Sequence, residues 1–452
     1  MDLRNKHIAI AGAARSGISA ALMVKNQGGI PFVTDSGPIA DKVKEMLDTH
    51  HIGFEENGHT GRSSSGDFLI VSPGIPTESP IVQSYLSTGK KVYSEIEVAS
   101  WFSNSPIVAV TGSNGKTTVV KWLHHTWNLA GRKSVVAGNV GTAFSAVVES
   151  TSPNTDALLE VSSFQLDHIE TFRPDVSILL NLTPDHLDRY DHSFEKYSHT
   201  KFKITENQTV SDTFILNMDD PVVARIGHSF VWRNGPPTIL EFSSRKEVRQ
   251  GAFLRNDNII LKINHKEELL MNIGELNLKG RHNLSNGMAT ALAARASEIK
   301  NEYIRESLRT FEGVAHRLEF VRKLDGVSYI NDSKATNVNA VWYALDRFDM
   351  PVVLILGGRD KGNDYMELED QLREKVHTLI TLGESSDRIQ SQLKGVVPHI
   401  KQAVSMKDAV KKARQAAKRG EIVLLSPACA SFDMFDSYED RGHQFKQAVI
   451  DL

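Results

Sequence analysis

The segment from Val108 to Thr118, Val-Ala-Val-Thr-Gly-Ser-Asn-Gly-Lys-Thr-Thr, holds residue types that bind a nucleoside triphosphate. An apolar β-branched run enters a turn of small residues, and Lys-Thr-Thr then opens a predicted helix. Small residues let backbone N–H groups approach phosphate oxygens, and the helix dipole favours an anion there. Lys116 supplies a charge for the β- and γ-phosphates, and the Thr117 hydroxyl is a ligand for Mg²⁺. The segment predicts a nucleoside-triphosphate site, although Val110 stands where the pattern G-x-x-x-x-G-K-[ST] has its first glycine.

Two further segments carry candidate metal ligands. Glu160 ends an apolar run that starts at Ala157, and hard cations prefer such carboxylate oxygens; the alternative is a solvated glutamate at a strand end. His186 lies in the polar block 183–190 and can ligate a metal or contact phosphate oxygens. Lys201 falls on a predicted helix, where its spacing alone indicates an ordinary surface lysine.

A third polar block, Asn331 to Asn337, follows a predicted strand and carries Asp332, Lys334 and Thr336 on one loop. A helix cap would need only one such residue, whereas this density suits the capture of a small substrate that bears carboxylates. The segments 356–362 and 426–431 end two more predicted strands. In a parallel sheet all three would reach the same edge.

The elements that must position these residues form three α/β series. In the first series, strands at 7–12, 30–35 and 68–71 alternate with helical stretches, which predicts a parallel sheet with its ligand at the carboxyl ends of the strands. Gly12-x-x-x-x-Gly17 is an incomplete dinucleotide fingerprint, because Ala14 replaces the middle glycine. An NAD site, a sugar-nucleotide site and a purely structural turn all remain open from these residues.

The second series surrounds the phosphate-binding segment. Its predicted strands lie at 134–137, 156–161, 176–182 and 213–216. From 230 to 278 the pattern changes to period two, which predicts antiparallel hairpins appended to the sheet, and a helix over 283–299 closes the unit. The third series begins after Gly313. Its predicted strands lie at 328–331, 352–356, 378–382 and 422–425.

Composition excludes several classes of protein. The 452 residues exceed the size of one core, and 52 Lys and Arg against 55 Asp and Glu argue against a nucleic-acid binder. The single cysteine, Cys429, rules out an internal disulfide and fits a reducing compartment. No signal peptide or membrane-spanning run is present in the sequence, so we expect a cytoplasmic protein without membrane insertion, and a monomer.

Taken together, these motifs resemble the Mur ligase family, and within it the members that add D-glutamate. The resemblance spans residues 12 to 442. It is carried by the phosphate-binding segment with Glu160, by Asp185-His186-Leu187-Asp188-Arg189, by His316-Arg317, by Asn331 to Asn337, and by Ser426 to Ser431.

The resemblance implies a domain order. Residues 1–104 would form a Rossmann-like domain that binds the UDP-sugar, and 105–312 a P-loop ATPase-like α/β domain with added antiparallel strands. Residues 313–452 would form a second Rossmann-like domain that binds D-glutamate and part of ATP.

The implied reaction joins D-glutamate to UDP-N-acetylmuramoyl-L-alanine with ATP and Mg²⁺, through an acyl phosphate. It is a cytoplasmic step of peptidoglycan synthesis, and thus of cell-wall biogenesis, cell shape and division. Two cation sites are implied, with Mn²⁺ as an alternative to Mg²⁺.

The resemblance also implies residue roles. The ATP phosphates would lie on Gly112, Ser113, Asn114, Gly115, Lys116, Thr117 and Thr118. Thr117 and Glu160 would hold the first Mg²⁺, and His186 and Lys201 the second, with Lys201 carrying a carbamate. The expected catalytic residues are Lys116, Asn139, His186 and Lys201.

The remaining implied residues bind the rest of the substrates. Adenosine would be bound, or the cleft shaped, by Arg317, Asp332 and Lys361. The D-glutamate pocket would comprise Lys334, Thr336, Ser431 and Tyr438. The sugar nucleotide would contact Arg15, Ser16, Asp35, Ser36 and Ser72.

The chain departs from the family pattern at two positions. Gly37 stands where some relatives have an arginine that contacts the nucleotide, and Arg15 is the candidate to supply that charge. Tyr438 stands where the family often has Phe. Three other classes compete with a D-glutamate ligase: a sibling ligase with another acceptor, a P-loop ATPase that acts as a mechanical switch, and a nicotinamide-dependent oxidoreductase.

Overall fold

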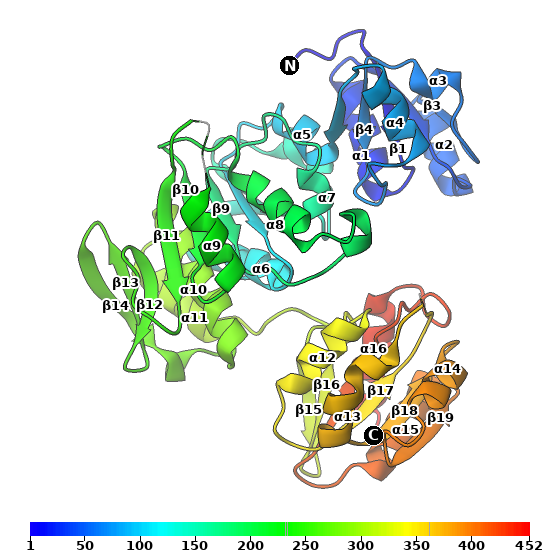
Figure 1. Ribbon diagram of the computed structural model, residues 1–452, viewed down its shortest axis with the longest axis vertical. Coiled ribbons are helices and arrows are strands. Elements are labelled where there is room, and N and C mark those ends of the chain that lie inside the picture. Colours follow the sequence, from blue (N-terminus) through cyan, green and yellow to red (C-terminus); the bar gives the residue numbers. More distant parts are fainter. Residues whose placement is uncertain (231, 233, 361) are drawn as a thin grey trace. The chain divides into compact units, whose positions relative to one another are not determined.

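The computed structural model describes residues 1–230, 232, 234–360 and 362–452, and Figure 1 shows its elements. The chain forms two compact units, Met1–Glu312 and Gly313–Leu452. The first unit contains two sheets and the second contains one, each flanked by helices. The predicted α/β class with three domains is confirmed.

The first sheet has the order β3-β2-β1-β4-β5, with every neighbouring pair parallel, as in a Rossmann fold. Its strands are β1 (His7–Ala11), β2 (Ile30–Thr34), β3 (Gly53–Glu55), β4 (Phe68–Val71) and β5 (Val92–Ser94). Its helices are α1 (Arg15–Asn26), α2 (Asp41–Thr49), α3 (Gly61–Ser64), α4 (Pro80–Ser87) and α5 (Glu95–Ser100). The three predicted strands are confirmed, whereas β3 and β5, of three residues each, were too short to give a pattern.

The second sheet has nine strands in the order β14-β13-β12-β11-β10-β9-β6-β8-β7. The strands are β6 (Ile107–Thr111), β7 (Lys133–Gly138), β8 (Thr155–Glu160), β9 (Val176–Leu179), β10 (Thr213–Asn217), β11 (Thr238–Ser243), β12 (Gly251–Arg255), β13 (Asn258–Ile263) and β14 (Lys266–Asn272). The predicted hairpin around 255–258 is confirmed, and Asn256 and Asp257 turn it with φ of 49° and 59°. The antiparallel prediction is wrong for β11 and β12, which run parallel, because period two reports a half-buried strand and not its direction.

Helices cover this sheet and connect its strands. They are α6 (Lys116–Leu129), α7 (Ser163–Leu166), α8 (Phe194–Phe202), α9 (Pro221–Ser229), α10 (Arg281–Ala296) and α11 (Asn301–Thr310). Short 3₁₀ turns are η1 (Phe144–Ala146), η2 (Val148–Ser150), η3 (Leu187–Arg189), η4 (Lys203–Thr205) and η5 (Ile273–Glu275). The predicted helix over 283–299 is α10, but α11 follows it, so α10 does not close the unit.

The second unit holds a six-stranded sheet in the order β15-β16-β20-β17-β18-β19. Its strands are β15 (Glu319–Leu324), β16 (Val327–Asn331), β17 (Val352–Leu356), β18 (Val376–Leu382), β19 (His399–Ala403) and β20 (Ile422–Leu425). Its helices are α12 (Val338–Asp346), η6 (Tyr365–Leu368), α13 (Glu369–Lys375), α14 (Ser386–Gln392), α15 (Met406–Ala416) and α16 (Tyr438–Ile450). The strand after Gly313 is the antiparallel edge strand β15 and not 328–331, and β19 is a further strand that the pattern missed.

Alternating residues of this sheet enter separate cores on its two faces. Leu354 and Leu424 pack with the helices α12 to α14, and Val353 and Val423 pack with α15 and α16. Burial on both faces explains why these strands read as continuous apolar runs in the sequence.

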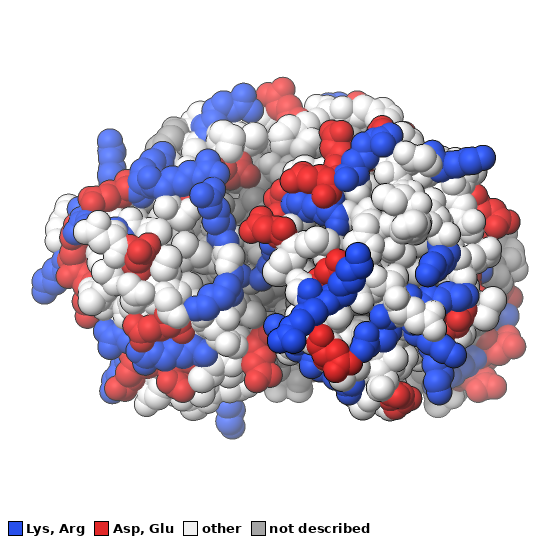
Figure 2. Space-filling view, turned by 90° about the horizontal axis from the view of Figure 1, so that it is seen from below, with Lys and Arg blue, Asp and Glu red and all other residues white. Residues whose placement is uncertain are grey.

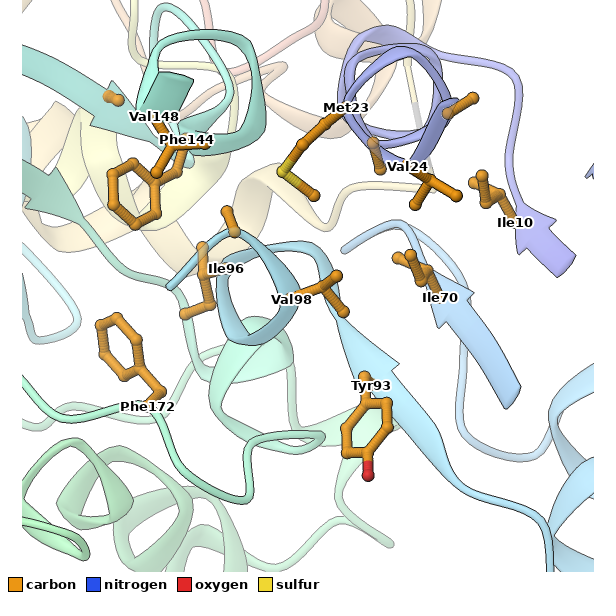
Figure 3. Close-up of a cluster of buried hydrophobic side chains, with 14 of the residues drawn as sticks. Ile10, Met23, Val24, Ile70, Tyr93, Ile96, Val98, Phe144, Val148 and Phe172 are labelled. Carbon is orange, nitrogen blue, oxygen red and sulfur yellow. The ribbon is translucent and has the colours of Figure 1, made fainter. Parts of the chain in front are cut away.

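A shared hydrophobic core joins the two sheets of the first unit. Met23 and Val24 on α1 pack with Ile96 on α5, and the same cluster contains Phe144 and Phe172 from the segments around the second sheet (Figure 3). Each of these side chains is 1% exposed or less. Because this core is continuous, α5 fixes the first sheet against the second.

Surface charge is mixed. Figure 2 shows Lys and Arg interspersed with Asp and Glu over the face that it draws, in keeping with the formal net charge of −3. Within the residues that the structure describes, no helix has the length and apolar character to cross a membrane.

Glu97 on α5 forms a second link within the first unit. Its side chain is fully buried, and its two carboxylate oxygens accept from the backbone N–H groups of Glu170, Thr171 and Phe172 at 2.8–3.0 Å. The indole Nε1 of Trp101 also donates to it, at 2.8 Å. The carboxylate therefore holds the chain between α7 and β9 against α5.

Glu97→Gln is expected to lower the free energy of unfolding by about 3 kcal/mol. The amide NH₂ would replace one carboxylate oxygen and would face the N–H groups that now donate to that oxygen. Urea unfolding followed by tryptophan fluorescence measures this change. Glu149→Gln is the control, since Glu149 is exposed and also bridges two segments of this unit, and we expect it to change stability by less than about 0.5 kcal/mol. Equal stabilities of the two variants would contradict the structural role of Glu97.

Candidate functional site

The phosphate-binding segment forms a tight turn between β6 and α6. Gly115 precedes α6 with φ of +88°, and a Cβ there would lie 2.7 Å from Oδ1 of Asn286. The side chain of Asn181 pairs with the backbone of Asn114, through bonds of 2.8 and 3.0 Å. Lys116 Nζ donates to the carbonyl oxygens of Gly112 and Ser113 at 2.7 and 2.9 Å. The ammonium therefore lies over the turn on which a phosphate would bind.

Two candidate metal ligands meet beside this turn. Thr117 Oγ1 donates to Glu160 Oε2 at 2.6 Å, and both side chains are buried. Neighbouring strands β6 and β8 bring them together, since Val110 pairs with Glu160 in the parallel register. Asn139 Nδ2 donates to the other carboxylate oxygen of Glu160 at 3.1 Å. Hydroxyl, carboxylate and amide oxygens are ligands that Mg²⁺ accepts.

Lys201 is buried, 2% exposed, so its interpretation as a surface lysine is wrong. Burial lowers the pKa of its ammonium well below the ordinary value, and the charge of Lys116 lowers it further, while the carboxylates of Asp185 and Glu160 oppose the shift. Lys201 Nζ also lies 4.9 Å from the centre of the Tyr197 ring. The structure therefore brings Lys201 into the electrostatic range of the phosphate-binding turn.

His186 lies on the loop after β9, in a left-handed conformation with φ of 51°. Its ring is exposed, 3.6 Å from the Asp185 carboxylate and edge-on to Phe164. Within the described residues, no three His, Cys, Asp or Glu side chains gather to hold a metal ion. Among the four predicted metal ligands, only Glu160 and His186 have carboxylate or imidazole side chains. The predicted second cation site therefore requires Lys201 as a ligand.

The carboxyl edge of the first sheet carries the predicted sugar-nucleotide residues. Asp35 follows β2 and accepts from the N–H groups of Ala13 and Gly37, at 2.8 and 2.9 Å. Gly12 directly follows β1 with φ of +98°, and a Cβ there would lie 2.7 Å from Ser72 Oγ. This hydroxyl is buried and has no hydrogen-bond partner within the described chain.

Arg189 connects this edge to the second sheet. Its guanidinium donates to the carbonyl oxygens of Gly74 and Ile75 at 3.1 and 2.8 Å and stacks on Phe164. The loop that follows Ser72 therefore lies against the loop that carries His186. Of the remaining predicted residues, Arg15 is exposed and opens α1, Ser16 is partly buried beside it, and Ser36 follows Asp35.

In the second unit, Asp332 lies at the carboxyl end of β16. Burial raises the pKa of its carboxyl to about 7, while a hydrogen bond from Ser426 and the charge of Arg317 oppose the shift. Ser426 Oγ donates to Oδ2 at 2.8 Å, and the Leu318 N–H donates to Oδ1 at 3.1 Å. Asp332 therefore ties the chain at Leu318 to the residue that follows β20.

The predicted D-glutamate residues occupy the same edge. The strands β16, β20 and β17 are parallel neighbours, so the loops after them meet, as the sequence predicted. Lys334 Nζ lies 5.8 Å from the centre of the Tyr438 ring. Ser431 is 2% exposed, and Thr336 is partly buried. Lys361, which the sequence also predicted, lies outside the described residues.

Sequence reasoning missed Arg441, which is 1% exposed on α16. It donates to Oγ and the carbonyl oxygen of Ser333, at 2.9 and 2.8 Å, and to the carbonyl oxygen of Cys429 at 3.0 Å. It therefore joins the loop after β16 to the loop after β20. Burial lowers the pKa of its guanidinium to about 10. No local pattern marks a buried arginine inside a polar helix.

Tyr197 and Asn181 were also missed. Tyr197 shares a hydrogen bond of 2.9 Å with Ser113 Oγ, and Asn181 braces Asn114 as described above. A signal existed for Tyr197, because it precedes Lys201 by one helical turn and thus shares its face of α8.

Family models match most of the chain. The MurD N-terminal domain matches residues 9–81, the Mur ligase middle domain 110–294, and the Mur ligase glutamate ligase domain 316–429. Curated relatives extend over the full length. UDP-N-acetylmuramoylalanine--D-glutamate ligase of Salinibacter ruber is 47% identical, with 100% of this chain and 99% of the relative covered. The enzyme of the same name from Porphyromonas gingivalis is 45% identical, with both chains fully covered.

Solved structures share the fold at low identity. UDP-N-acetylmuramate-alanine ligase MurC from Thermotoga maritima has a TM-score of 0.58 and 15% identity, over 99% of this chain and all of the other. MurF ligase from the same organism, in complex with ADP, has a TM-score of 0.57 and 15% identity over 100% and 96%. Since the family models and the full-length relatives agree with the site geometry, the chain belongs to the Mur ligase family.

Proposed function

We propose that this protein uses ATP to join D-glutamate to UDP-N-acetylmuramoyl-L-alanine, in the cytoplasmic stage of peptidoglycan synthesis. The observation that carries the proposal is the full-length similarity to ligases named for this reaction. The site supports it, because an ammonium and a buried hydroxyl–carboxylate pair lie at a glycine-rich turn that precedes a helix.

The reaction proceeds in two steps. The L-alanine carboxylate attacks the γ-phosphorus of ATP, the bond to the β-γ bridging oxygen breaks, and ADP leaves behind an acyl phosphate. The amine of D-glutamate then attacks the acyl carbon, loses a proton, and displaces phosphate to form the amide. Because the first step brings two anions together, Lys116 has to offset their repulsion at the phosphates.

The residues of the first unit fit two cations. Thr117 and Glu160 would hold the first Mg²⁺, with Asn139 beside them, and His186 and Lys201 would hold the second if Lys201 carries a carbamate. Mn²⁺ is an alternative at both. Bound cations would neutralise charge on the phosphate oxygens. Lys201 suits a carbamate because burial favours the neutral amine, the form that reacts with CO₂.

Three domains divide the substrates in this proposal. Residues 1–104 bind the sugar nucleotide through Arg15, Ser16, Asp35, Ser36 and Ser72. Residues 105–312 bind the ATP phosphates. Residues 313–452 bind D-glutamate through Lys334, Thr336, Ser431 and Tyr438. In the same domain, adenosine is bound or the cleft is shaped by Arg317, Asp332 and Lys361. The protein acts as a monomer.

The acceptor is tested by phosphate release with ATP, UDP-N-acetylmuramoyl-L-alanine and a panel of D- and L-amino acids. We expect release with D-glutamate and little with the others. Preference for another amino acid would indicate a sibling ligase. ATP turnover indifferent to the sugar nucleotide would indicate a mechanical ATPase, and NADPH binding that survives Lys116→Ala would indicate an oxidoreductase.

Lys116→Ala is expected to lower kcat by at least about a hundredfold, because it removes charge that stabilises the transition state more than the ground state. Lys121→Ala is the matched control, since Lys121 is an exposed lysine on the same helix. Steady-state phosphate release measures both variants. Full activity of Lys116→Ala would exclude this lysine from the chemistry.

Lys201→Ala is expected to be inactive and to recover part of its activity with millimolar acetate or formate, which replace the missing carbamate oxygens. Lys196→Ala, which alters an exposed lysine on the same helix α8, should stay active and should not respond to the acids. An inactive Lys201→Ala that neither acid rescues, with an unchanged circular dichroism spectrum, would contradict the carbamate.

A further inference from the structure

The residues that follow β9, at positions 180–183, form a loop that lies directly against the phosphate-binding turn. The N–H of Ser113 donates to the carbonyl oxygen of Asn181 at 2.9 Å, and the Asn181 side chain pairs with Asn114 as described above. Ser113 Oγ also donates to the carbonyl oxygen of Thr183 and accepts from the Thr183 N–H, both at 2.9 Å. The position of this β9 loop therefore determines the position of the turn.

Two polar side chains at the end of β10 hold the β9 loop from the opposite side, because β9 lies between β10 and β6 in the sheet. Asn217 is the last residue of β10 and is buried, and its Nδ2 donates to the carbonyl oxygen of Leu180 at 2.8 Å. Asp220 follows three residues later, and its Oδ2 accepts the N–H of Leu182 at 2.8 Å. These two bonds flank Asn181, the residue that pairs with the turn.

The local structure of β10 and α9 uses only one end of each side chain. Asn217 Oδ1 accepts the N–H of Asp219 at 2.9 Å. Asp220 Oδ1 accepts the N–H groups of Val222 and Val223 at 2.9 and 3.0 Å and thereby caps α9. A serine with a single oxygen would cap the helix equally well. The other ends, Nδ2 of Asn217 and Oδ2 of Asp220, both bind the β9 loop.

We propose that Asn217 and Asp220 are positioning residues for the phosphates of ATP, which act through the β9 loop on the phosphate-binding turn. A turn that binds phosphate depends on the directions of several backbone N–H groups, so a displacement of the turn weakens several bonds to the phosphate oxygens together. This inference rests on the proposed function, since it requires ATP as a substrate. It assigns to the two side chains an effect on nucleotide binding and none on the sugar nucleotide.

Two substitutions test the two bonds separately. Asp220→Asn keeps one oxygen to cap α9, but its NH₂ faces the N–H of Leu182. Asn217→Asp keeps an oxygen to accept the N–H of Asp219, but its second oxygen faces the carbonyl oxygen of Leu180. In each variant we expect the Kd for ADP with Mg²⁺, measured by isothermal titration calorimetry, to rise about fivefold or more. The Kd for UDP-N-acetylmuramoyl-L-alanine should change by less than about twofold.

Asp219→Asn is the matched control. Asp219 is the partly buried carboxylate next to Asp220, but it accepts from Oγ of Ser243 and from the N–H and Oγ of Ser244, at the end of β11. Any loss of stability in this variant should leave the Kd for ADP within about twofold of the unmodified value.

An unchanged Kd for ADP in either test variant, an equal rise in Asp219→Asn, or a common rise in the Kd values for ADP and the sugar nucleotide would overturn the proposal. Circular dichroism checks that each variant is folded, and either test variant is sufficient if the other does not fold. A failure of the proposed function would show differently, because the unmodified protein would then not bind ADP.

Discussion

The hydrogen bond between Thr117 Oγ1 and Glu160 Oε2 is the interaction on which the first unit's site depends. It exists because β6 and β8 are parallel neighbours, so the residues that follow or end them meet at one edge. On the other side of β8, the backbone of Gly138 on β7 lies close to Glu160, since a Cβ on Gly138 would lie 2.3 Å from the Glu160 carbonyl oxygen. Glycine there lets Asn139 reach the same carboxylate. Sheet topology, rather than any long-range loop, thus sets the spacing of the site.

Buried charge is the second constraint. Lys201 lies at 2% exposure within the influence of both Lys116 and the carboxylates of Glu160 and Asp185. Desolvation of an ammonium is unfavourable, so a structure optimised for stability alone would place an apolar side chain here. The ring of Tyr197 covers the amine and its hydroxyl bonds to Ser113 on the phosphate-binding turn. Helix α8 therefore places Lys201 beside the phosphate-binding turn. A site that gathers charged groups around a phosphate requires such a placement.

These features differ in how far the sequence reveals them. The phosphate-binding turn was predictable because glycine, lysine and threonine act there through local backbone geometry. The burial of Lys201 was not, because one face of α8 is covered by residues distant in sequence. Short strands such as β3 escaped detection since three residues carry no period. The direction of β12 escaped because alternation reports which face is buried and not how strands run. The family resemblance, and not the spacing of residues, identified Lys201 as a candidate site residue.

The second unit also contains a buried charged side chain, and it stabilises that charge in a different way. Arg441 is buried, and the partners described above are a hydroxyl and backbone carbonyls, all of them uncharged. These groups accept hydrogen bonds from its guanidinium, and the negative charge of Asp433 on the loop after β20 also acts on it. Arg441 thereby holds the loop after β16 against the loop after β20.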